Sequence, residues 1–478
     1  MCAAAFAAAV AESPLTGLGA GGFLMVRSPG GEVALLDFFV AVPGLGPDGR
    51  RLDPRDLDRF TVPFGGADQV FHIGPASVAV PGMAIGLGEA LRRFGRLPLP
   101  EVLAPAVRTA REGVVLTAET AYLHTILGDM LTASPESAAV YAPEGRLLGE
   151  GERVRFDDLA ESLEQLGREG TGAMRDGSLA RVIVDHLSER GGLVTRDDLA
   201  AYQVIDRAPL RVGYRGVTLL TNPPPSSGGA LIAIALRAME EQAPAGADAV
   251  ARYRALARAG VAANAVRDER FHADLGEEDC VERLWARRPT GTTHTSAVDA
   301  DGGMASLSSS NGSGSGVMAA GTGNLLNNML GEEDLNPGGF GQLEPGERMT
   351  SMMAPSLLLR DGEPVMALGS AGSNRLRSAI LQTVVNLVDA GMDVPAAVRF
   401  PRIHPEGDGI DVEGGVGDDA AEALLADGHR IRRWGETNLF FGGVSAAGFG
   451  RDGFEAAGDP RRGGAAAAVT AAGEVIDL

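Results

Sequence analysis

The sequence predicts an α/β (α+β) fold in which two central β-sheets lie between two outer layers of helices. Three observations lead to this prediction. Strand-like segments recur along the chain, helical segments occur in both of its halves, and no linker with a change of composition divides its 478 residues. An order of helix, sheet, sheet and helix accounts for all three observations.

The first half of the chain combines a buried hairpin with several helices. An apolar first helix ends near Glu12, and the glycine-rich turn 16–22 leads into a hairpin at 23–37. A short strand at 217–220 comes later. Thr195, followed by acidic residues, has the pattern of a helix N-cap. Apolar residues spaced three and four positions apart predict the other helices, at 84–94, 99–112, 178–189 and 230–239.

The second half is richer in strands. A β-prone segment begins at Thr292, turns at 301–303 and continues as a strand to 308, after which a Ser/Gly loop covers 309–316. Two more hairpins are expected, at 357–368 with the turn Asp361-Gly362, and at 442–457. The segment 369–374 leads from a strand into a helix at 378–390.

Composition and charge exclude several functional classes. A net charge of -21 repels phosphates, so no nucleic-acid partner and no membrane partner are predicted. All 42 basic residues are arginines, which excludes a phosphate-loop lysine and a lysine Schiff base. Two cysteines and seven scattered histidines give no metal-ligand pattern, so neither a metal nor any other cofactor is predicted.

The N-terminal segment bears on localisation. Residues 1–10 are apolar without a preceding basic residue, which is typical of a buried helix rather than a signal peptide. The chain as written is therefore predicted to be cytoplasmic. A periplasmic or secreted location is expected instead if the N-terminus is incomplete.

The residues around Thr292 point to nucleophilic chemistry. A threonine hydroxyl needs a base, and the chain has no Gly-x-Ser-x-Gly elbow. A pair with His294, two positions along a strand, is one possibility. The other is cleavage between Gly291 and Thr292, because the new α-amino group, with a pKa of ~7.7–8.0, can accept the hydroxyl proton.

A second requirement of this chemistry is an oxyanion hole. The segment 369–374 lies between a strand and a helix N-terminus, where several backbone N–H groups lack partners. The same pattern also fits an ordinary strand-to-helix turn. The interpretation as a catalytic site therefore depends on further motifs.

Such motifs occur along nearly the whole chain. The segment Gly291-Thr-Thr-His-Thr-Ser-Ala-Val-Asp299 resembles the start of the small subunit of γ-glutamyltranspeptidases, which are N-terminal nucleophile hydrolases. Further resemblances follow in the family's order, at residues 16–22, 80–82, 191–202, 214–216, 223–229, 325–328, 350–352, 369–372 and 459–461. The resemblance implies a four-layer αββα sandwich and a proenzyme that splits into a large subunit, 1–291, and a small subunit, 292–478, which together form one domain.

The resemblance also implies roles for individual residues. Thr292 first attacks the carbonyl of Gly291 and then serves as the catalytic nucleophile. Thr293 matches a supporting threonine, and Asn311 matches a residue that contacts the substrate. A further hydroxyl that bonds the nucleophile falls on Ser309 or Ser310. The backbone N–H groups of Gly372 and Ser373 match the oxyanion-binding pair.

The positions that read the substrate depart from the family pattern. Phe39 stands where an arginine normally holds the substrate α-carboxylate, and a neutral ring cannot form that ion pair. Thr350 and Ser351 match a serine pair that helps to hold the same carboxylate. On the amino side Met329 and Glu332 replace a glutamine and an aspartate, so an acidic group is kept on a longer arm.

Three functions remain open from the sequence. The first is hydrolysis or transfer of γ-glutamyl groups of glutathione and related amides through an acyl-enzyme on Thr292, with water or an amine as acceptor. The second is an amidase or acylase of the same family with another acyl group, such as a glutaryl or cephalosporin-type group. The third is an uncleaved protein that only binds its ligand.

Overall fold

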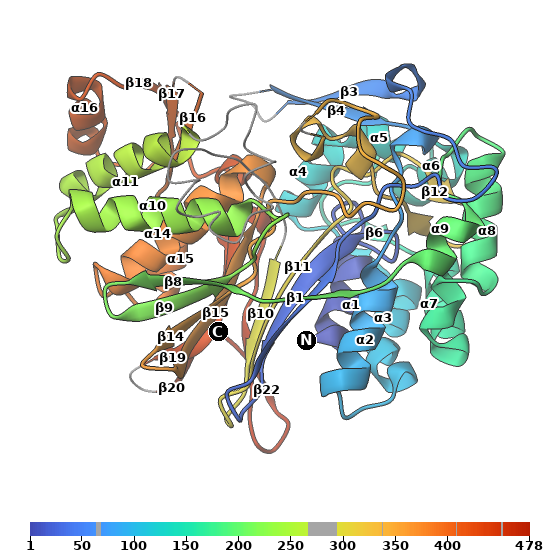
Figure 1. Cartoon of the computed structure of the whole chain (residues 1–478), viewed down its shortest axis with the longest axis horizontal. Coiled ribbons are helices and arrows are strands. Elements are labelled where there is room, and N and C mark those ends of the chain that lie inside the picture. The colour runs from blue at the N-terminus through green and yellow to red at the C-terminus, as the bar shows by residue number, and fades with distance from the viewer. Residues whose placement is uncertain (64–67, 266–293, 337, 408, 451–452) are drawn as a thin grey trace. The chain divides into compact units, whose positions relative to one another are not determined.

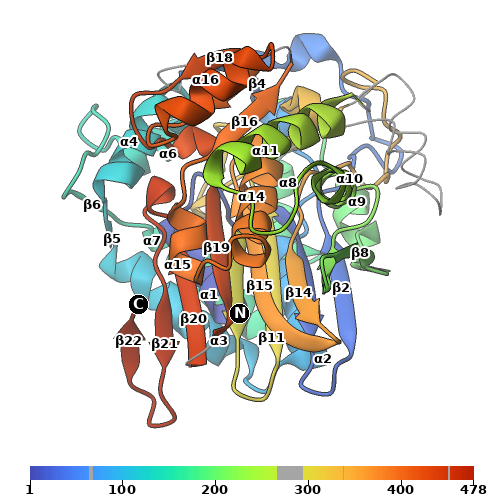
Figure 2. The same cartoon turned by 90° about the vertical axis from the view of Figure 1, so that its left-hand side faces the viewer.

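The computed structural model describes residues 1–63, 68–265, 294–336, 338–407, 409–450 and 453–478 (Figures 1 and 2). Within it the chain forms two compact units. Unit 1 comprises residues 1–23, 36–206 and 309–349, and unit 2 comprises residues 24–35, 207–308 and 350–478. Each unit therefore contains segments from both sides of position 291. No described helix combines the length and the apolar character needed to cross a bilayer.

Unit 1 is mainly helical. Helix α1 (Cys2–Ala11) packs on α3 (Leu99–Glu112), which in turn packs on α7 (Asp157–Glu169). Its other helices are α2 (Met83–Phe94), α4 (Ala118–Ile126), α5 (Gly128–Leu131), α6 (Pro135–Tyr141), α8 (Ser178–Ser188) and α9 (Arg196–Ala201). Thr195 caps α9 in a reciprocal pair with Asp198, as predicted from its position before the acidic first turn. Short strand pairs complete the unit: β3 (Asp58–Pro63) with β4 (Asp68–Ile73), β5 (Val114–Val115) with β6 (Arg153–Val154), and β12 (Met318–Ala319) with β13 (Asn324–Leu325).

Unit 2 is built on a six-stranded antiparallel sheet. Its strand order is β20-β19-β15-β14-β9-β8, and its core is apolar. Helices α10 (Gly228–Gln242) and α14 (Leu376–Val388) pack on it, and α11 (Ala249–Asn264) packs on α10 (Figure 2). The six strands are β8 (Leu210–Tyr214), β9 (Val217–Thr221), β14 (Ser356–Arg360), β15 (Glu363–Ala371), β19 (Gly443–Gly450) and β20 (Gly453–Gly458).

The β14–β15 hairpin shows why the sequence forms these strands. Apolar residues fill both strands, and the turn residues Asp361 and Gly362 have φ angles of 52° and 85°. Two successive positive φ angles are the geometry that an Asp-Gly pair supports in a tight hairpin. The predicted hairpin at 357–368 is confirmed.

A second sheet contains the strand that follows the predicted cleavage position. Strands β10 (His294–Val298) and β11 (Met304–Ser310) pair antiparallel, with His294 opposite Ser308 and Val298 opposite Met304. The full strand order is β10-β11-β1-β2-β7, with β1 at Gly21–Arg27, β2 at Val33–Phe38 and β7 at Ile205–Arg207. Within unit 2, β10 packs face to face against β15 and β19 of the six-stranded sheet.

The structure corrects and extends the predicted elements. The loop expected from Ser309 begins later, because β11 continues through Ser310. The β3–β4 hairpin was not predicted. A three-stranded sheet of β16 (Ile403–Glu406), β17 (Gly409–Val412) and β18 (Arg430–Arg433) was also missed. The remaining elements are α15 (Val394–Arg399), α16 (Asp418–Ala426), β21 (Ala467–Val469) and β22 (Val475–Asp477).

Candidate active site

The predicted cleavage position and nucleophile lie outside the described residues. This holds for Gly291, Thr292 and Thr293, and the description resumes at His294, the first residue of β10. The other predicted site residues fall into two groups, one in each compact unit. Unit 2 contains His294, Thr350, Ser351, Gly372 and Ser373, and unit 1 contains Phe39, Ser309, Ser310, Asn311 and Glu332.

In unit 2, hydroxyl groups surround the imidazole of His294. Its Nδ1 lies 3.0 Å from Oγ of Ser308, the residue opposite it on β11. Its Nε2 lies 2.8 Å from Oγ of Ser296 and 3.4 Å from Oγ of Ser306. Because side chains alternate along a strand, Ser306 and Ser308 both present their hydroxyls on the side of β11 that faces this ring.

The hydrogen bonds of the serines determine where the imidazole carries its proton. Ser296 donates its hydroxyl hydrogen to the carbonyl of Ser445, and Ser306 donates its own to the carbonyl of Leu368. Each hydroxyl has one hydrogen, so both serines can only accept from the histidine. Nε2 therefore carries the proton, and the lone pair of Nδ1 accepts from the hydroxyl of Ser308.

The environment keeps this imidazole neutral. Part of residue 294 remains accessible, but the ring itself is enclosed, and its burial lowers the pKa of His294 to about 3. The backbone of β15 lies close on one side, because a Cβ built on Gly369 would be 2.3 Å from Nδ1. His294 is thus a neutral ring with both nitrogens engaged, which argues against the predicted alternative of a Thr/His pair.

The turn predicted to bind the oxyanion follows the last ladder residue of β15, Ala371. Gly372 has a φ of 121° and Ser373 a φ of 49°. A Cβ on Gly372 would lie 2.8 Å from Cα of Gly442, so glycine is required there for space as well as for its backbone angle. The turn then leads into α14, whose N-terminus carries the positive end of the helix dipole.

Thr350 is half-buried and Ser351 is buried in unit 2, where Ser351 forms a parallel β-bridge with Ser226. The Ser351 hydroxyl accepts a hydrogen bond of 3.0 Å from the backbone N–H of Met353. Its carbonyl accepts from the hydroxyls of Ser226 and Ser227 at 3.1 and 3.0 Å. These contacts fix the backbone around Ser351, and the predicted role of the two residues in substrate binding stays a prediction.

In unit 1, the serine pair and Asn311 lie at the end of β11. The Ser309 hydroxyl lies 2.9 Å from Oγ1 of Thr16, whereas the Ser310 hydroxyl accepts from the N–H of Gly312 at 2.7 Å. The amide of Asn311 is fully buried, and among the described residues its Nδ2 makes two long hydrogen bonds, both 3.4 Å, to the carbonyls of Ser13 and Leu325. Its Oδ1 has no hydrogen-bond partner in the described part of the chain.

The side chain of Glu332 contacts the turn that follows Asn311. Its Oε1 accepts from the N–H of Ser313 at 3.1 Å, and Oδ1 of Asn328 accepts from the same N–H at 2.9 Å. Gly312, with a φ of 72°, makes this approach possible, because a Cβ there would lie 2.3 Å from Oε1 of Glu332. The structure thus places the predicted Asn311 and Glu332 around one short turn, 311–313.

Phe39 is part of the unit 1 core instead of lining an open site. Its side chain is 1% exposed and its ring stacks on Phe23 with 5.6 Å between the centroids. Its carbonyl accepts from the hydroxyl of Tyr202 at 2.6 Å and from the guanidinium of Arg348. Arg348 also lies 3.5 Å from Oδ1 of Asp37, so this arginine already holds the backbone around residue 39.

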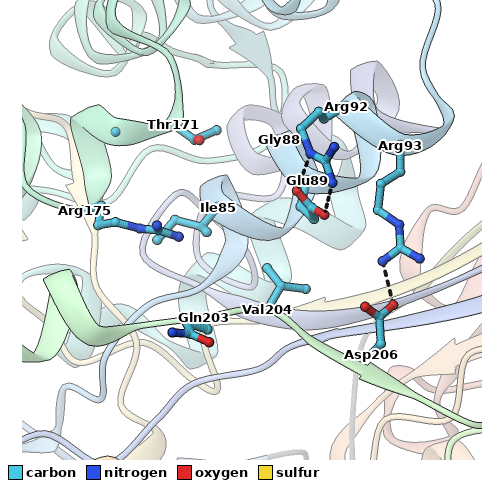
Figure 3. A pocket seen from close by; sticks show the side chains of 11 residues that line it. Ile85, Gly88, Glu89, Arg92, Arg93, Thr171, Arg175, Gln203, Val204 and Asp206 are labelled. Carbon is cyan, nitrogen blue, oxygen red and sulfur yellow. Dashed lines mark hydrogen bonds and ion pairs between the residues drawn. The ribbon is translucent and has the colours of Figure 1, made fainter.

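A separate hollow of about 340 Å³ lies in unit 1 between α2 and the 171–175 and 203–206 segments. Figure 3 shows two of its arginines in ion pairs, Arg92 with Glu89 at 2.6 Å and Arg93 with Asp206 at 2.5 Å. None of the predicted site residues lines it. Thr171 supplies the hydroxyl group among its lining residues, and both carboxylates of the lining, Glu89 and Asp206, are in the ion pairs just described.

Comparison with known proteins identifies the family. Residues 1–282 and 255–469 match the family described as gamma-glutamyltranspeptidase. The chain belongs to this family. The predicted resemblance is confirmed, and the protein is a γ-glutamyltranspeptidase-like enzyme.

Relatives of two kinds are similar to the chain. The acylase ACY 1 proenzyme of Pseudomonas sp. (strain SE83) is 33% identical, over 94% of this chain and 85% of the relative. The glutathione hydrolase proenzyme of Escherichia coli (strain K12) is 29% identical, over 90% of this chain and 80% of the relative. The crystal structure of cephalosporin acylase from Bacillus halodurans covers 97% of this chain and 89% of its own, with 25% identity and a TM-score of 0.81. The predicted N-terminal nucleophile hydrolase fold is confirmed.

Sequence reasoning missed the contacts that surround His294. The sequence indicates ordinary strand positions for Ser296, Ser306 and Ser308. It gives Gly369 as the first residue of the segment predicted to bind the oxyanion, whereas the structure places Gly369 within β15. One signal could have revealed them. Small hydroxyl residues at alternate positions opposite a histidine on a neighbouring strand indicate a buried polar ring that needs partners.

Proposed function

We propose that the chain cuts its own backbone between Gly291 and Thr292 and then uses Thr292 as the nucleophile of an amide hydrolase or acyltransferase. The single observation that supports this proposal most strongly is that both ring nitrogens of His294 are already hydrogen-bonded. It is the histidine nearest to Thr292, and its contacts leave it no lone pair with which to act as a base. The α-amino group of a new N-terminal threonine supplies the missing base, since its pKa is ~7.7–8.0.

The proposed reaction has two stages. In the first, Oγ of Thr292 attacks the carbonyl of Gly291, the peptide bond shifts to an ester, and water hydrolyses it to a carboxylate and a free amine. In the second, Oγ attacks the substrate amide while the N–H groups of Gly372 and Ser373 hold the oxyanion. The amine product leaves with the proton, and water or another amine then releases the acyl group from Thr292.

Cleavage in this manner yields two subunits, 1–291 and 292–478. Contacts across position 291 within each unit would keep them together. In unit 1, Asn327 is fully buried and its side chain bonds the backbone of Gly19 and Ala79. In unit 2, β14 pairs with β9, with Leu357 opposite Leu220. The subunits would therefore remain one folded body without a covalent link.

The first substrate class that we propose is the γ-glutamyl amides, including glutathione. Glu332 would pair with the α-ammonium group of the glutamyl moiety, because it is an acidic group fixed beside the Asn311 turn. Asn311 Oδ1 can accept a hydrogen bond at the same place. Thr350 and Ser351 would contribute hydroxyl contacts to the α-carboxylate.

A second candidate is an acylase whose acyl group lacks that α-carboxylate contact. The specific observation in its favour is Phe39, which is buried against Phe23. An arginine fork at this position would have to enter an apolar stack, and Arg348 is already engaged with Asp37 and the carbonyl of Phe39. The acylase relatives and the cephalosporin acylase structure are consistent with such a substrate.

Two measurements test these proposals together. N-terminal sequencing of the purified protein is expected to give a second sequence that starts at Thr292. A single uncut chain that turns over amides would contradict the mechanism, and a single uncut chain without activity would favour a binding protein. Initial rates with a γ-glutamyl, a glutaryl and a 4-aminobutyryl anilide then separate the acyl groups, since the glutaryl substrate lacks only the α-amino group and the 4-aminobutyryl substrate lacks only the α-carboxylate.

A further inference from the structure

We infer that His294 is a positioning residue, which fixes strand β10 against the strand that ends in the oxyanion turn, and that it is not the proton acceptor of the reaction. The inference rests on the proposed function, because His294 would act through Thr292, two residues before it in the sequence. The contacts that carry the inference all lie within unit 2.

The first step of the argument is the number of strands that the ring connects. His294 lies on β10, and its Nδ1 accepts from Ser308 on β11. Its Nε2–H is shared between the hydroxyls of Ser296 and Ser306, and each of these serines also bonds to a further strand. Ser296 is bonded to the carbonyl of Ser445 on β19, and Ser306 is bonded to the carbonyl of Leu368 on β15. One imidazole thus links β10 and β11 of the five-stranded sheet to β15 and β19 of the six-stranded sheet.

The second step is the fit of the ring against β15. A methyl group on Gly369 would lie within 2.6 Å of Nδ1, Cε1 and Cγ of His294, so the ring rests directly on the backbone of that glycine. Gly369 pairs with Ser445 in the ladder and lies three residues before Gly372. The ring therefore sets the distance between the start of β10 and the strand that leads into the oxyanion turn.

The third step is whether the imidazole can still act as a base. A base needs a free lone pair, and the only lone pair of this tautomer accepts from Ser308. No charged side chain is among the hydrogen-bond partners of the ring in the described chain, and desolvation alone accounts for its low pKa. A ring with these properties holds position, and it does so without a change of charge across the neutral pH range.

Displacement of β10 is expected to affect the chemical step more than binding. A shift of ~1 Å in reacting groups can reduce the rate by about 100-fold. His294→Phe fills the space but removes all three hydrogen bonds of the ring, so kcat should fall by on the order of 100-fold while KM changes little. His294→Asn keeps an acceptor for Ser308 and has no titratable group, so it should recover about tenfold of that loss.

The pH profile separates positioning from base catalysis. The acidic limb of kcat/KM should stay at the same pH in the wild type and in His294→Asn, because it reports the α-amino group of Thr292. His429→Asn, in the turn before β18, is the matched control and should behave as the wild type. The positioning role is overturned if the acidic limb of kcat/KM disappears in His294→Asn, or if that variant is as inactive as His294→Phe.

A double-mutant cycle tests the packing on Gly369 directly. Gly369→Ala should lower kcat because its methyl group displaces the ring, whereas the same change in a His294→Ala background should cost nothing more. Additive effects would overturn the inference. Mass analysis of each variant, before its rates are measured, shows whether the chain is cut at Thr292. A wild type that is active but uncut would refute the proposed function, whereas a correctly cut wild type with additive variants would refute only the positioning role.

Discussion

The two units hold their predicted site residues in opposite ways. Around His294 in unit 2, each ring nitrogen and each neighbouring serine hydroxyl has a matched partner at 2.8 to 3.1 Å. Around Asn311 in unit 1, the amide makes only bonds of 3.4 Å and its buried Oδ1 accepts none within the described chain. A saturated network fixes geometry, whereas an unsatisfied acceptor can still bind a group that arrives from outside.

Under the proposed function, the saturated network lies beside the residues that perform the reaction, and the unsatisfied acceptor lies beside Glu332, which would bind the α-ammonium group of the substrate. The oxyanion turn and the His294 network need the same geometry for any acyl group. If Glu332 binds the α-ammonium group as proposed, the 311–313 turn and Glu332 need a geometry that suits one acyl group. Acylases and glutathione hydrolases both occur among the relatives of the chain, so the proposed function allows the acyl group to differ within one family.

The largest expected effect comes from Thr292→Ala. Without the hydroxyl, neither the backbone cut nor the acyl-enzyme can form, so the chain should migrate as one band on a denaturing gel. Activity should fall by on the order of 10⁴-fold or more. Thr293→Ala, one residue further on, tests the supporting hydroxyl and should retain cleavage. If the Thr292→Ala protein were cut and active, Thr292 would not be the nucleophile, and the comparison of the two units under the proposed function would fail.

The next largest effect is expected at the oxyanion turn. Gly372→Ala places a methyl group 2.8 Å from Cα of Gly442 at a φ of 121°, so the turn must move and kcat should fall by ~10²–10³-fold. Gly391→Ala is the matched control, since that glycine also has a positive φ, 60°, but no atom within 4 Å of the added methyl. Equal losses in both variants would show that backbone strain, and not the position of the turn, lowers the rate.

A smaller and more selective effect is expected at Glu332. Glu332→Gln removes the charge but keeps the size of the side chain, so kcat/KM for a γ-glutamyl anilide should fall by roughly 10–100-fold, while a glutaryl anilide should be little affected. Glu333→Gln changes an exposed neighbour and is the control. A uniform loss for both substrates would mean that Glu332 supports the 311–313 turn and does not read the ammonium group.

The fold was predictable because local signals and layer packing agree. The Asp361-Gly362 turn, the Thr195 cap and the helical periodicity of α2 and α3 each rest on contacts between near neighbours in the sequence. The β16–β18 sheet escaped prediction because it joins short strands, among them β17 and β18, which pair in parallel across the intervening helix α16.

The candidate site was predictable to a different degree. Motifs identified Gly372, Ser373, Asn311 and Glu332, but they could not show that Glu332 and Asn311 share one turn. They also showed that Phe39 replaces an arginine of the family pattern, but they could not show that its ring packs in the core. Such features depend on contacts between residues far apart in the chain, and no local pattern encodes them.

The smallest effect is a pH dependence of stability that distinguishes the His294 network. The pKa of His294 is lowered to about 3 by burial, whereas an unfolded histidine titrates near ~6.5. Below pH ~6.5 the unfolded chain gains a proton that the folded ring does not accept, so His294 lowers stability as the pH falls from 6.5 toward 3. His294→Asn removes this proton uptake, and the decline of Tm between pH 7 and 5 should become shallower.

His124 is the control in unit 1. Burial lowers its pKa to about 4, so it titrates in the same direction, and His124→Asn should flatten the same slope without a change in kcat. Equal slopes in the wild type and in His294→Asn would show that the ring can be protonated in the folded state, and the contrast between a fixed unit 2 network and an adaptable unit 1 turn would then lose its physical basis.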